Sequence, residues 1–369
     1  MTDQHIAVFG FYGVGNFGDD LMAWMIAKQL HSWGYQVTLF SLAAQGEDSL
    51  QSPDFKRHGL KTSSSIEQTL HSCDAVIYGG GGLLVGKTNT TLRQFSRHFK
   101  SEQQFLDAVK ERHLPLLVLS VGGDGGRDPA QLDDFARAVL QEARVVTVRN
   151  ACDLHLLDCL GIQAHHAADL VWGARDFFPS TPTTRSRMRI GLDLYPSLLR
   201  SRGGAKFLAF LQILLLKHHR MDWLALNSHQ IKSGCCVGIT DLLQAPNLRR
   251  HRFRGLRDAM TQLASLDLLI SSRLHVPMVA LQHGVPIISV CAEAKTQQML
   301  QENGLRFASF PPERLADLQA MLWSRSKLQA WIAAFDRQRQ HPNPVGWGEH
   351  FDLLASLSGG KDANRRPFS

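Results

Sequence analysis

The segment GVGNFGDD (13–20) combines a glycine pattern with two carboxylates. Its glycines spell G-x-G-x-x-G directly after an apolar run, which is the pattern of a dinucleotide-binding turn. Such a turn places a pyrophosphate on the N-terminus of a helix, where Asp19 and Asp20 would repel it. Ser41 also stands where that fingerprint requires an acidic residue after the second strand. These residues argue against a nicotinamide-dependent oxidoreductase.

Asp19 and Asp20 have two possible roles. Carboxylates at the start of a helix can cap its N–H groups and interact favourably with its dipole. A carboxylate in the same place can also face a ligand and accept a proton from a hydroxyl. We expect one of the pair to act as a cap and the other to be a candidate general base.

Two further glycine clusters follow apolar runs, GGGG at 79–82 and SVGGDGG at 120–126. Glycine at the end of a strand allows a ligand to approach the backbone N–H groups closely. The carboxyl ends of parallel strands meet at one edge of a sheet. Three clusters at that edge predict a ligand site rather than three empty turns.

The second half of the chain has a different set of reactive side chains. An apolar run ends near Ser272 and is followed by Arg273, His275 and a helix with Pro277 in its first turn. Arginine offers a planar fork to a carboxylate or phosphate, and histidine can donate a proton to a leaving oxygen. Lys295 follows the next predicted strand and could add a second cation.

No metal is expected. The histidine pairs at 165–166 and 218–219 do not have the spacing of metal ligands. His283 lies on the helix after His275 and is expected to be structural.

Short apolar runs typical of strands alternate along the chain with longer patterns typical of helices, and the candidate residues follow the ends of the apolar runs. Such alternation predicts parallel sheets with helices on both faces. The pattern restarts after a Pro, Thr and Ser-rich segment, so the expected class is α/β with two Rossmann-like domains.

Helix 328–338 is expected to pack back toward the first domain. The expected parts are a first domain at 1–176, a linker at 177–187, a second domain at 188–327, and a C-terminal helix and basic tail at 328–369. The expected strands are 5–11, 36–42, 74–78, 115–121, 144–148, 189–194, 222–226, 267–271 and 285–290.

The net charge, the cysteines and the longest apolar run indicate which kinds of partner and compartment suit this protein. The 369 residues carry a formal net charge of +7 and a pI near 9.2, which suits phosphorylated substrates, an anionic membrane face or nucleic acid. Six cysteines without a C-x-x-C pair are typical of reduced thiols in a cytosolic protein. The run AKFLAFLQILLL at 205–216 is shorter than the ~20 residues of a spanning helix, and we expect it to form a buried helix.

Several segments together resemble the polysaccharide pyruvyl transferase family, in family order over roughly residues 5–305. The resemblance implies a glycosyltransferase-B-like architecture, with two Rossmann-like domains facing across a cleft. It also implies transfer of pyruvate from phosphoenolpyruvate onto two hydroxyls of a sugar, as a ketal, with no cofactor. The segments are GFYGVGNFGDD (10–20), DAVIYGGGGLL (74–84), LSVGG (119–123), VTVRNACDLHLLDCLGI (146–162), ADLVW (168–172) and SSRLHVPMVALQHGVPIISV (271–290), with Lys295 after them.

By position, the resemblance implies His275 as the acid and Asp19 as the base. It assigns donor binding to Ser272, Arg273 and Lys295. The implied acceptor or cleft residues are Asn16, Gly18, Asp20, Gly80, Gly81, Gly122, Arg149 and Asp169. The acceptor would be a sugar or lipid-linked saccharide, handled by a cytoplasmic protein at the inner face of a membrane, and no nucleic-acid partner is expected.

Three departures from the family pattern leave alternatives open. Asp193 and Tyr195 stand where the family often has Arg at the end of a strand, Asp124 interrupts a G-I-G-P-like segment, and CAEAK at 291–295 retains only Lys295. One alternative is a glycosyltransferase that uses a nucleotide-sugar donor. The other is a non-catalytic homologue that binds a sugar or membrane in envelope assembly.

Overall fold

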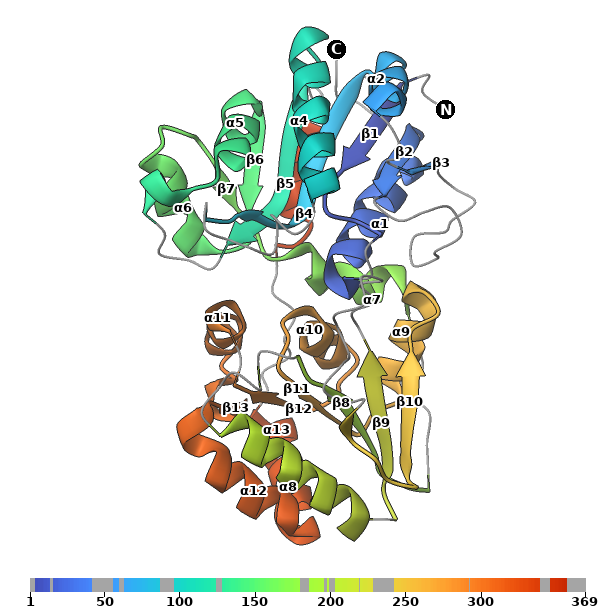
Figure 1. The fold of residues 1–369 in the computed structure, drawn as a ribbon, viewed down its shortest axis with the longest axis vertical. Coiled ribbons are helices and arrows are strands. Elements are labelled where there is room, and N and C mark those ends of the chain that lie inside the picture. The colour runs from blue at the N-terminus through green and yellow to red at the C-terminus, as the bar shows by residue number, and fades with distance from the viewer. Residues whose placement is uncertain are drawn as a thin grey trace. The chain divides into compact units, whose positions relative to one another are not determined.

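A computed structural model divides the chain into two compact units (Figure 1). The first unit comprises residues 1–14, 18–173 and 345–369, and the second comprises 15–17 and 174–344. The predicted linker lies partly at 180–185, outside the described residues, as does Asp124. The structure describes residues 4–13, 16–41, 56–59, 63–86, 96–123, 128–179, 186–195, 198, 203–218, 220–227, 242–291, 293–338 and 346–356.

The first unit contains a sheet of parallel strands in the order β3-β2-β1-β4-β5-β6-β7. Its strands are β1 (His5–Phe9), β2 (Gln36–Ser41), β3 (Lys56–Gly59), β4 (Ala75–Leu84), β5 (Leu116–Gly123), β6 (Val145–Val148) and β7 (His165–His166). Its helices are α1 (Phe17–Ser32), α2 (Ser63–His71), α4 (Ser96–Glu111), α5 (Asp134–Glu142), α6 (Ala151–Asp158) and α14 (Glu349–Ser356).

The core of the first unit forms because its central strands are apolar on both faces, as buried parallel strands require. On one face, side chains of β1, β4 and β5 pack against α2, α4, α5 and α6. Phe9 stacks on Phe105 there, with ring centroids 4.0 Å apart. The C-terminal α14 packs in this unit through Phe351, whose ring meets those of Trp33 and Trp347 edge-on.

The second unit contains a smaller parallel sheet in the order β10-β9-β8-β11-β12-β13. Its strands are β8 (Arg189–Asp193), β9 (Asp222–Asn227), β10 (Leu248–Arg252), β11 (Leu268–Ser271), β12 (Ile287–Val290) and β13 (Ser309–Phe310). Its helices are α7 (Ala174–Phe177), α8 (Gly204–Lys217), α9 (Leu256–Ala264), α10 (His275–Gln282), α11 (Ala294–Glu302), α12 (Leu315–Trp323) and α13 (Arg325–Gln338).

Both sheets have one reversal of strand order, between β1 and β4 in the first unit and between β8 and β11 in the second. Open α/β sheets bind ligands beyond the carboxyl ends of the strands at such a reversal. The predicted α/β class with two Rossmann-like domains is confirmed. The reversals also show where in each unit a ligand site is expected.

The glycine clusters differ from the expected loops. β4 continues through 79–84 and β5 through 120–123 instead of ending before them. Gly80 and Gly81 have φ angles of 70° and 128°, which glycine adopts at no steric cost, and the pairing of β4 with β5 shifts register after Gly81. Within the described residues, 79–82 and 120–123 are therefore irregular strand ends rather than separate turns.

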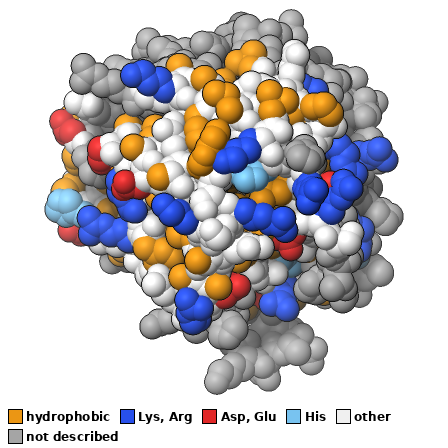
Figure 2. Space-filling model, turned by 90° about the horizontal axis from the view of Figure 1, so that it is seen from below, with side chains coloured by type: hydrophobic (Ala, Val, Ile, Leu, Met, Phe, Trp, Pro, Cys, Tyr) orange, Lys and Arg blue, Asp and Glu red, His pale blue; other side chains and the backbone are white. Residues whose placement is uncertain are grey.

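Two expectations about helices need correction. α13 packs in the second unit, where Leu328 joins the core with α8 and α12, and α14 is the helix that returns to the first unit. The run at 205–216 forms α8 but is not wholly buried, because Ile213 and Leu216 are 55% and 54% exposed. Figure 2 shows hydrophobic side chains at the surface among Lys and Arg side chains.

We predict that Phe335→Ala lowers the free energy of unfolding by about 3–5 kcal/mol, because it empties a fully buried site. The Phe335 ring lies 5.4 Å from that of Phe307 and 5.3 Å from that of Trp331, measured between centroids. Denaturant unfolding followed by circular dichroism measures the loss. Gln338→Ala, at an exposed position of the same helix, is the control. Equal midpoints for both variants would contradict the observed packing of α13.

Candidate functional site

Asp19 and Asp20 lie in the first turn of α1 and have different surroundings. Asp20 is fully buried and its Oδ1 accepts a hydrogen bond of 2.6 Å from the N–H of Gly13, so it holds the preceding turn in place. Asp19 is 5% exposed, and a Cβ built on Gly81 would lie 2.9 Å from its Oδ1. Asp19 thus lies against the irregular end of β4, at the reversal between β1 and β4. Asn16 directly precedes α1, and Gly18 lies buried in its first turn.

Tyr12 lies buried beside these carboxylates, although the sequence did not single it out. Burial, followed by the charge of Asp19, raises the pKa of the Tyr12 phenol well above its ordinary value. The ring also occupies the space beside Gly10, where a Cβ would lie 2.5 Å from the ring. Tyr12 therefore stays neutral and helps shape the turn that carries Asp19.

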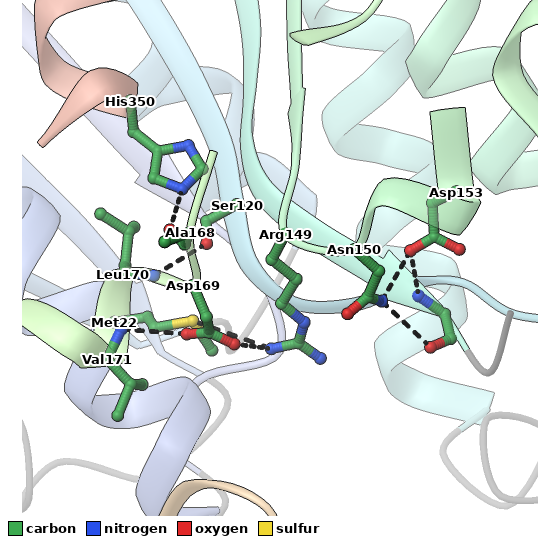
Figure 3. Close-up of polar contacts among 11 residues, drawn as sticks. Met22, Ser120, Arg149, Asn150, Asp153, Ala168, Asp169, Leu170, Val171 and His350 are labelled. Carbon is green, nitrogen blue, oxygen red and sulfur yellow. Dashed lines mark hydrogen bonds and ion pairs between the residues drawn. The ribbon is translucent and has the colours of Figure 1, made fainter. Parts of the chain in front are cut away.

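Arg149 and Asp169 form an almost fully buried ion pair. Arg149 Nη1 donates to Asp169 Oδ2 at 3.1 Å, with 8% and 7% of each residue exposed. The N–H of Val171 donates to Asp169 Oδ1 at 2.9 Å, which leaves this carboxylate fixed from both sides. Arg149 Nη1 also lies 4.0 Å from Met22 Sδ of α1. Figure 3 shows the arginine extending from the end of β6 toward Asp169 and α1.

Two glycines leave the space that the Arg149 side chain and its neighbour Met22 occupy, because a larger residue at either position would collide with them. A Cβ on Gly122 would lie 2.7 Å from Arg149 Nε, and a Cβ on Gly80 would lie 2.6 Å from Met22 Cβ. Close contacts, several of them through Met22, thus connect six of the predicted residues within the first unit. They are Asp19, Gly80, Gly81, Gly122, Arg149 and Asp169.

Hydrogen bonds to the Asp153 carboxylate hold the end of β5. Asp153 Oδ2 accepts hydrogen bonds from the N–H of Gly123 at 3.1 Å and from Asn150 Nδ2 at 2.7 Å. Both side chains follow Arg149 at the start of α6 (Figure 3). These bonds therefore connect the end of β5 to the start of α6, directly after the arginine.

His350 of α14 joins the same region through a chain of hydrogen bonds. Its Nε2 lies 2.8 Å from the carbonyl oxygen of Ala168, and its Nδ1 lies 2.7 Å from Thr147 Oγ1. A carbonyl can only accept, so Nε2 carries the proton and Nδ1 accepts from the Thr147 hydroxyl. Thr147 Oγ1 in turn accepts from the N–H of Ser120 at 2.8 Å, and Ser120 Oγ accepts from the N–H of Leu170 at 3.2 Å. This chain fixes the backbone on both sides of Asp169.

In the second unit, hydroxyl groups at the end of β11 position Arg273. Ser271 Oγ lies 3.3 Å from Asp193 Oδ2 of β8 and accepts a bond of 3.0 Å from the N–H of Arg273. Ser272 Oγ accepts from the N–H of Tyr195 at 2.7 Å. The Arg273 guanidinium lies over the Tyr195 ring, 4.8 Å from its centroid, which is a favourable cation–π distance.

His275 opens α10 directly after these residues and is partly buried. The N-cap position is held by Leu274, whose apolar side chain cannot accept from the first N–H groups of the helix. These N–H groups and the helix dipole favour an anion. Arg273, His275 and the start of α10 follow one another in the chain after β11, and each is a kind of group that a carboxylate or phosphate would bind.

Lys295 and His283 contribute less to this site. Lys295 Nζ forms an ion pair of 2.9 Å with Glu293, so its charge is partly compensated. His283 caps the end of α10, as a structural histidine would, and burial followed by the charge of Arg175 lowers its pKa to about 4.

In the part of the chain that the structure describes, no group of three His, Cys, Asp or Glu side chains is placed to hold a metal ion.

We predict that His350→Gln reduces the pH dependence of stability. Burial lowers the pKa of His350 from 6.5 to about 4, so between these values the unfolded chain binds the additional proton and stability rises with pH. The contribution, on the order of 2–3 kcal/mol, is complete above pH ~6.5 and lost as pH falls toward ~4.

Denaturant unfolding across this range measures the slope. The slope should fall in His350→Gln without vanishing, because His283 is shifted in the same direction. His155→Gln, at an exposed position of α6, is the control. A slope unchanged by His350→Gln would show that the histidine is not held neutral in the fold.

Comparisons with known proteins agree with this architecture. Similar solved structures include proteins named as UDP-N-acetylglucosamine 2-epimerases from Listeria monocytogenes (TM-score 0.63, 11% identity, 99% of both chains covered) and Methanocaldococcus jannaschii (0.59, 11%, 97% of this chain and 100% of that chain). The Neisseria meningitidis enzyme, bound to UDP-GlcNAc, has a TM-score of 0.58 and 12% identity over 96% and 98% of the chains. At such identities the likeness shows the fold alone, and it confirms a glycosyltransferase-B-like architecture.

The sequence match is more specific than the structural one. No curated protein matches the chain. The profile of the family described as polysaccharide pyruvyl transferase matches residues 16–291, which is most of the chain and includes nearly all of the candidate residues. This protein therefore belongs to the polysaccharide pyruvyl transferase family and is a transferase.

Proposed function

We propose that this protein transfers the pyruvyl group of phosphoenolpyruvate to two hydroxyls of a sugar, forming a ketal on a surface polysaccharide or its lipid-linked precursor. The observation that supports this most strongly is the arrangement of Arg273 and His275 at the strand reversal of the second unit. Family membership supports the reaction class. The geometry supports the charge and proton chemistry that the reaction needs.

The donor suits the second unit because it is a compact dianion or trianion. Its carboxylate and phosphate need a cation whose position is fixed, and Arg273 is held by Ser271 at its N–H and by the Tyr195 ring at its guanidinium. The start of α10 adds N–H groups. Lys295 adds a cation whose charge is shared with Glu293.

The chemistry requires one acid and one base. In the first step His275 protonates C3 of phosphoenolpyruvate while an acceptor hydroxyl attacks C2 and gives its proton to Asp19. In the second step the other hydroxyl attacks C2, the C2–O bond to phosphate breaks, and the phosphate leaves with that hydroxyl's proton. Both acceptor oxygens end on C2, which is the ketal carbon. Charge-assisted bonds from Arg273 would stabilise the leaving phosphate.

The acceptor suits the first unit because carboxylates dominate there. Asp19 is buried at the reversal between β1 and β4, where an acceptor hydroxyl could donate to it. The neutral phenol of Tyr12 is a neighbour that would not compete for that proton. The Arg149–Asp169 pair offers fixed polar groups to further hydroxyls. A lipid-linked acceptor would bring the protein to the cytoplasmic face of a membrane.

A nucleotide-sugar glycosyltransferase is the alternative that a specific observation favours. Asp193 and Tyr195 replace the arginine expected at the end of β8, and an aromatic ring there could also contact a base. Release of a nucleoside diphosphate, with no response to phosphoenolpyruvate, would favour this alternative. A non-catalytic homologue would bind sugar or membrane without turnover and would tolerate substitution of His275. Among the residues that the structure describes, every helix is too short or too polar to span a lipid bilayer.

We predict that Arg273→Ala mainly weakens donor binding, by about one to two decades, because a charge-assisted pair contributes roughly 1.5–3 kcal/mol. His275→Ala should instead cut turnover by roughly 10²–10⁴-fold with donor affinity closer to normal. Calorimetry measures affinity, and phosphate release with a panel of sugar acceptors measures turnover.

The control is Arg257→Ala, which removes an exposed arginine of α9 in the same unit. Normal turnover in His275→Ala would show that this histidine is not the acid. Equal donor affinity in Arg273→Ala and Arg257→Ala would remove the case for a donor site at α10.

We predict that Asp19→Asn retains donor affinity and loses transfer. The amide is nearly isosteric with the carboxylate and keeps the packing against Gly81, but it cannot accept the hydroxyl proton. The same two assays measure the split. If Asp19→Asn abolishes donor binding, the donor lies in the first unit and the division between the units is wrong.

A further inference from the structure

The exposed large hydrophobic side chains of the described residues all belong to the second unit. Ile213 and Leu216 on α8 are 55% and 54% exposed, Leu242 is 55% exposed, and Trp323 at the end of α12 is 46% exposed. Single exposed hydrophobics are ordinary, whereas a contiguous group marks an interaction site. The question is whether these four form one surface.

Contacts on both sides of α8 connect them. Lys217 Nζ lies 3.5 Å above the Trp323 ring and donates to the Trp323 carbonyl at 2.9 Å. On the other side, Gln212 and Gln244 exchange hydrogen bonds between α8 and the segment that carries Leu242. The α8 surface, defined as Ile213, Leu216, Lys217, Leu242 and Trp323, is thus built on three neighbouring segments.

The sequence of α8 shows that this exposure is built into the helix. Phe207, Leu211, Leu214 and Leu215 point into the core, as the inner face of an amphipathic helix should. The outer face of a helix that meets water usually carries charged and polar residues of both signs. The α8 sequence, GAKFLAFLQILLLK, has no acidic residue. Its outer face carries Ile213 and Leu216 instead.

Cations surround the apolar side chains. In the described parts of 203–227, 242–250 and 321–330, seven side chains are Lys or Arg and only Asp222 is acidic; Asp222 is itself paired with Arg249 at 3.0 Å. Burial, and then the charges of Lys217 and Arg325, lowers the pKa of His218, which places Arg325 near the end of α8. Figure 2 shows one face of the molecule on which hydrophobic, Lys, Arg and histidine side chains lie together with fewer Asp and Glu side chains. The exposed cations besides Lys217 are Lys206, Arg220, Arg249, Arg250, Arg325 and Lys327.

The α8 surface lies away from the candidate donor residues. α8 ends at Lys217 and the chain enters β9 at Asp222, so the last turns of the helix are near the amino ends of the strands. Ser271 and Arg273 follow the carboxyl end of β11. An occupant of the α8 surface would therefore leave that edge of the sheet open.

We propose that the α8 surface docks the protein on an anionic lipid bilayer, with its four hydrophobic side chains entering the headgroup region and its cations pairing with lipid phosphates. This deepens the lipid-linked part of the proposed function by naming the surface that binds. Apolar residues with flanking Lys and Arg bind such interfaces, and tryptophan favours the headgroup level. A second copy of this chain fits less well, because two basic faces would repel each other.

Vesicle flotation tests the proposal. The full-length protein should bind phosphatidylcholine vesicles that contain phosphatidylglycerol, bind pure phosphatidylcholine much less, and dissociate as salt shortens the screening length to ~8 Å and below. The double variant Ile213→Gln with Leu216→Gln should bind at least tenfold more weakly. Lys217→Glu should weaken binding by on the order of tenfold or more, while Arg257→Glu on α9, with the same change in net charge, should bind as wild type does.

Three results would overturn the proposal. They are absent binding by the wild type, equal binding by the double variant, and equal losses in Lys217→Glu and Arg257→Glu. Light scattering without lipid supplies another: a dimer that the double variant converts to a monomer would make the surface an interface between copies. Phosphate release with soluble acceptors should be normal in all these variants, so failure of the docking surface and failure of pyruvyl transfer are separate outcomes.

Discussion

The buried ion pair between Arg149 and Asp169 is the interaction on which the site of the first unit depends. Removing one partner of such a pair leaves an uncompensated charge and costs about 3–5 kcal/mol, so the surrounding structure must hold both partners in place. Asp169 is fixed by the N–H of Val171 and by the chain that runs from His350 to Leu170. Arg149 lies between Met22 and the glycine edge of β5. Segments from both ends of the chain therefore converge on one pair, and the glycines of β4 and β5 leave the space it needs.

The two strand reversals carry opposite kinds of side chain. In the first unit the reversal holds a buried carboxylate beside a neutral phenol, whereas in the second it holds an arginine on an aromatic ring and a histidine at a helix start. Each unit therefore carries its own kind of polar side chain, a carboxylate suited to accept a proton in the first and a cation suited to bind an anion in the second. The α8 surface is at the other end of the second unit's strands, so the proposed membrane docking would leave the proposed donor site of that unit open.

Sequence reasoning predicted the central strands and the helix at 205–216 because apolar residues are dense where an element is buried. It missed the edge strands β3, β7, β10 and β13, which are short or polar, as in HH for β7 and LRRHR for β10; an edge strand has one neighbour and needs no apolar run. It predicted loops at the glycine clusters because register shifts inside strands leave no signature in composition. His350 was missed because its burial depends on α14 returning to the first unit, and one histidine among 17 carries no signal of its own. The family resemblance, in contrast, did point to Arg149 and Asp169 as site residues. It did not predict that they form an ion pair with each other.

Isotope transfer tests the central claim most directly. Phosphoenolpyruvate labelled with carbon-13 at C2 is incubated with the protein and candidate sugar acceptors, and the products are examined by NMR. The account predicts that the labelled carbon becomes a quaternary ketal carbon bonded to two sugar oxygens, with one inorganic phosphate released for each ketal formed. If phosphoenolpyruvate is untouched while a UDP-sugar is consumed and its diphosphate released, the chain is a glycosyltransferase and the account is contradicted.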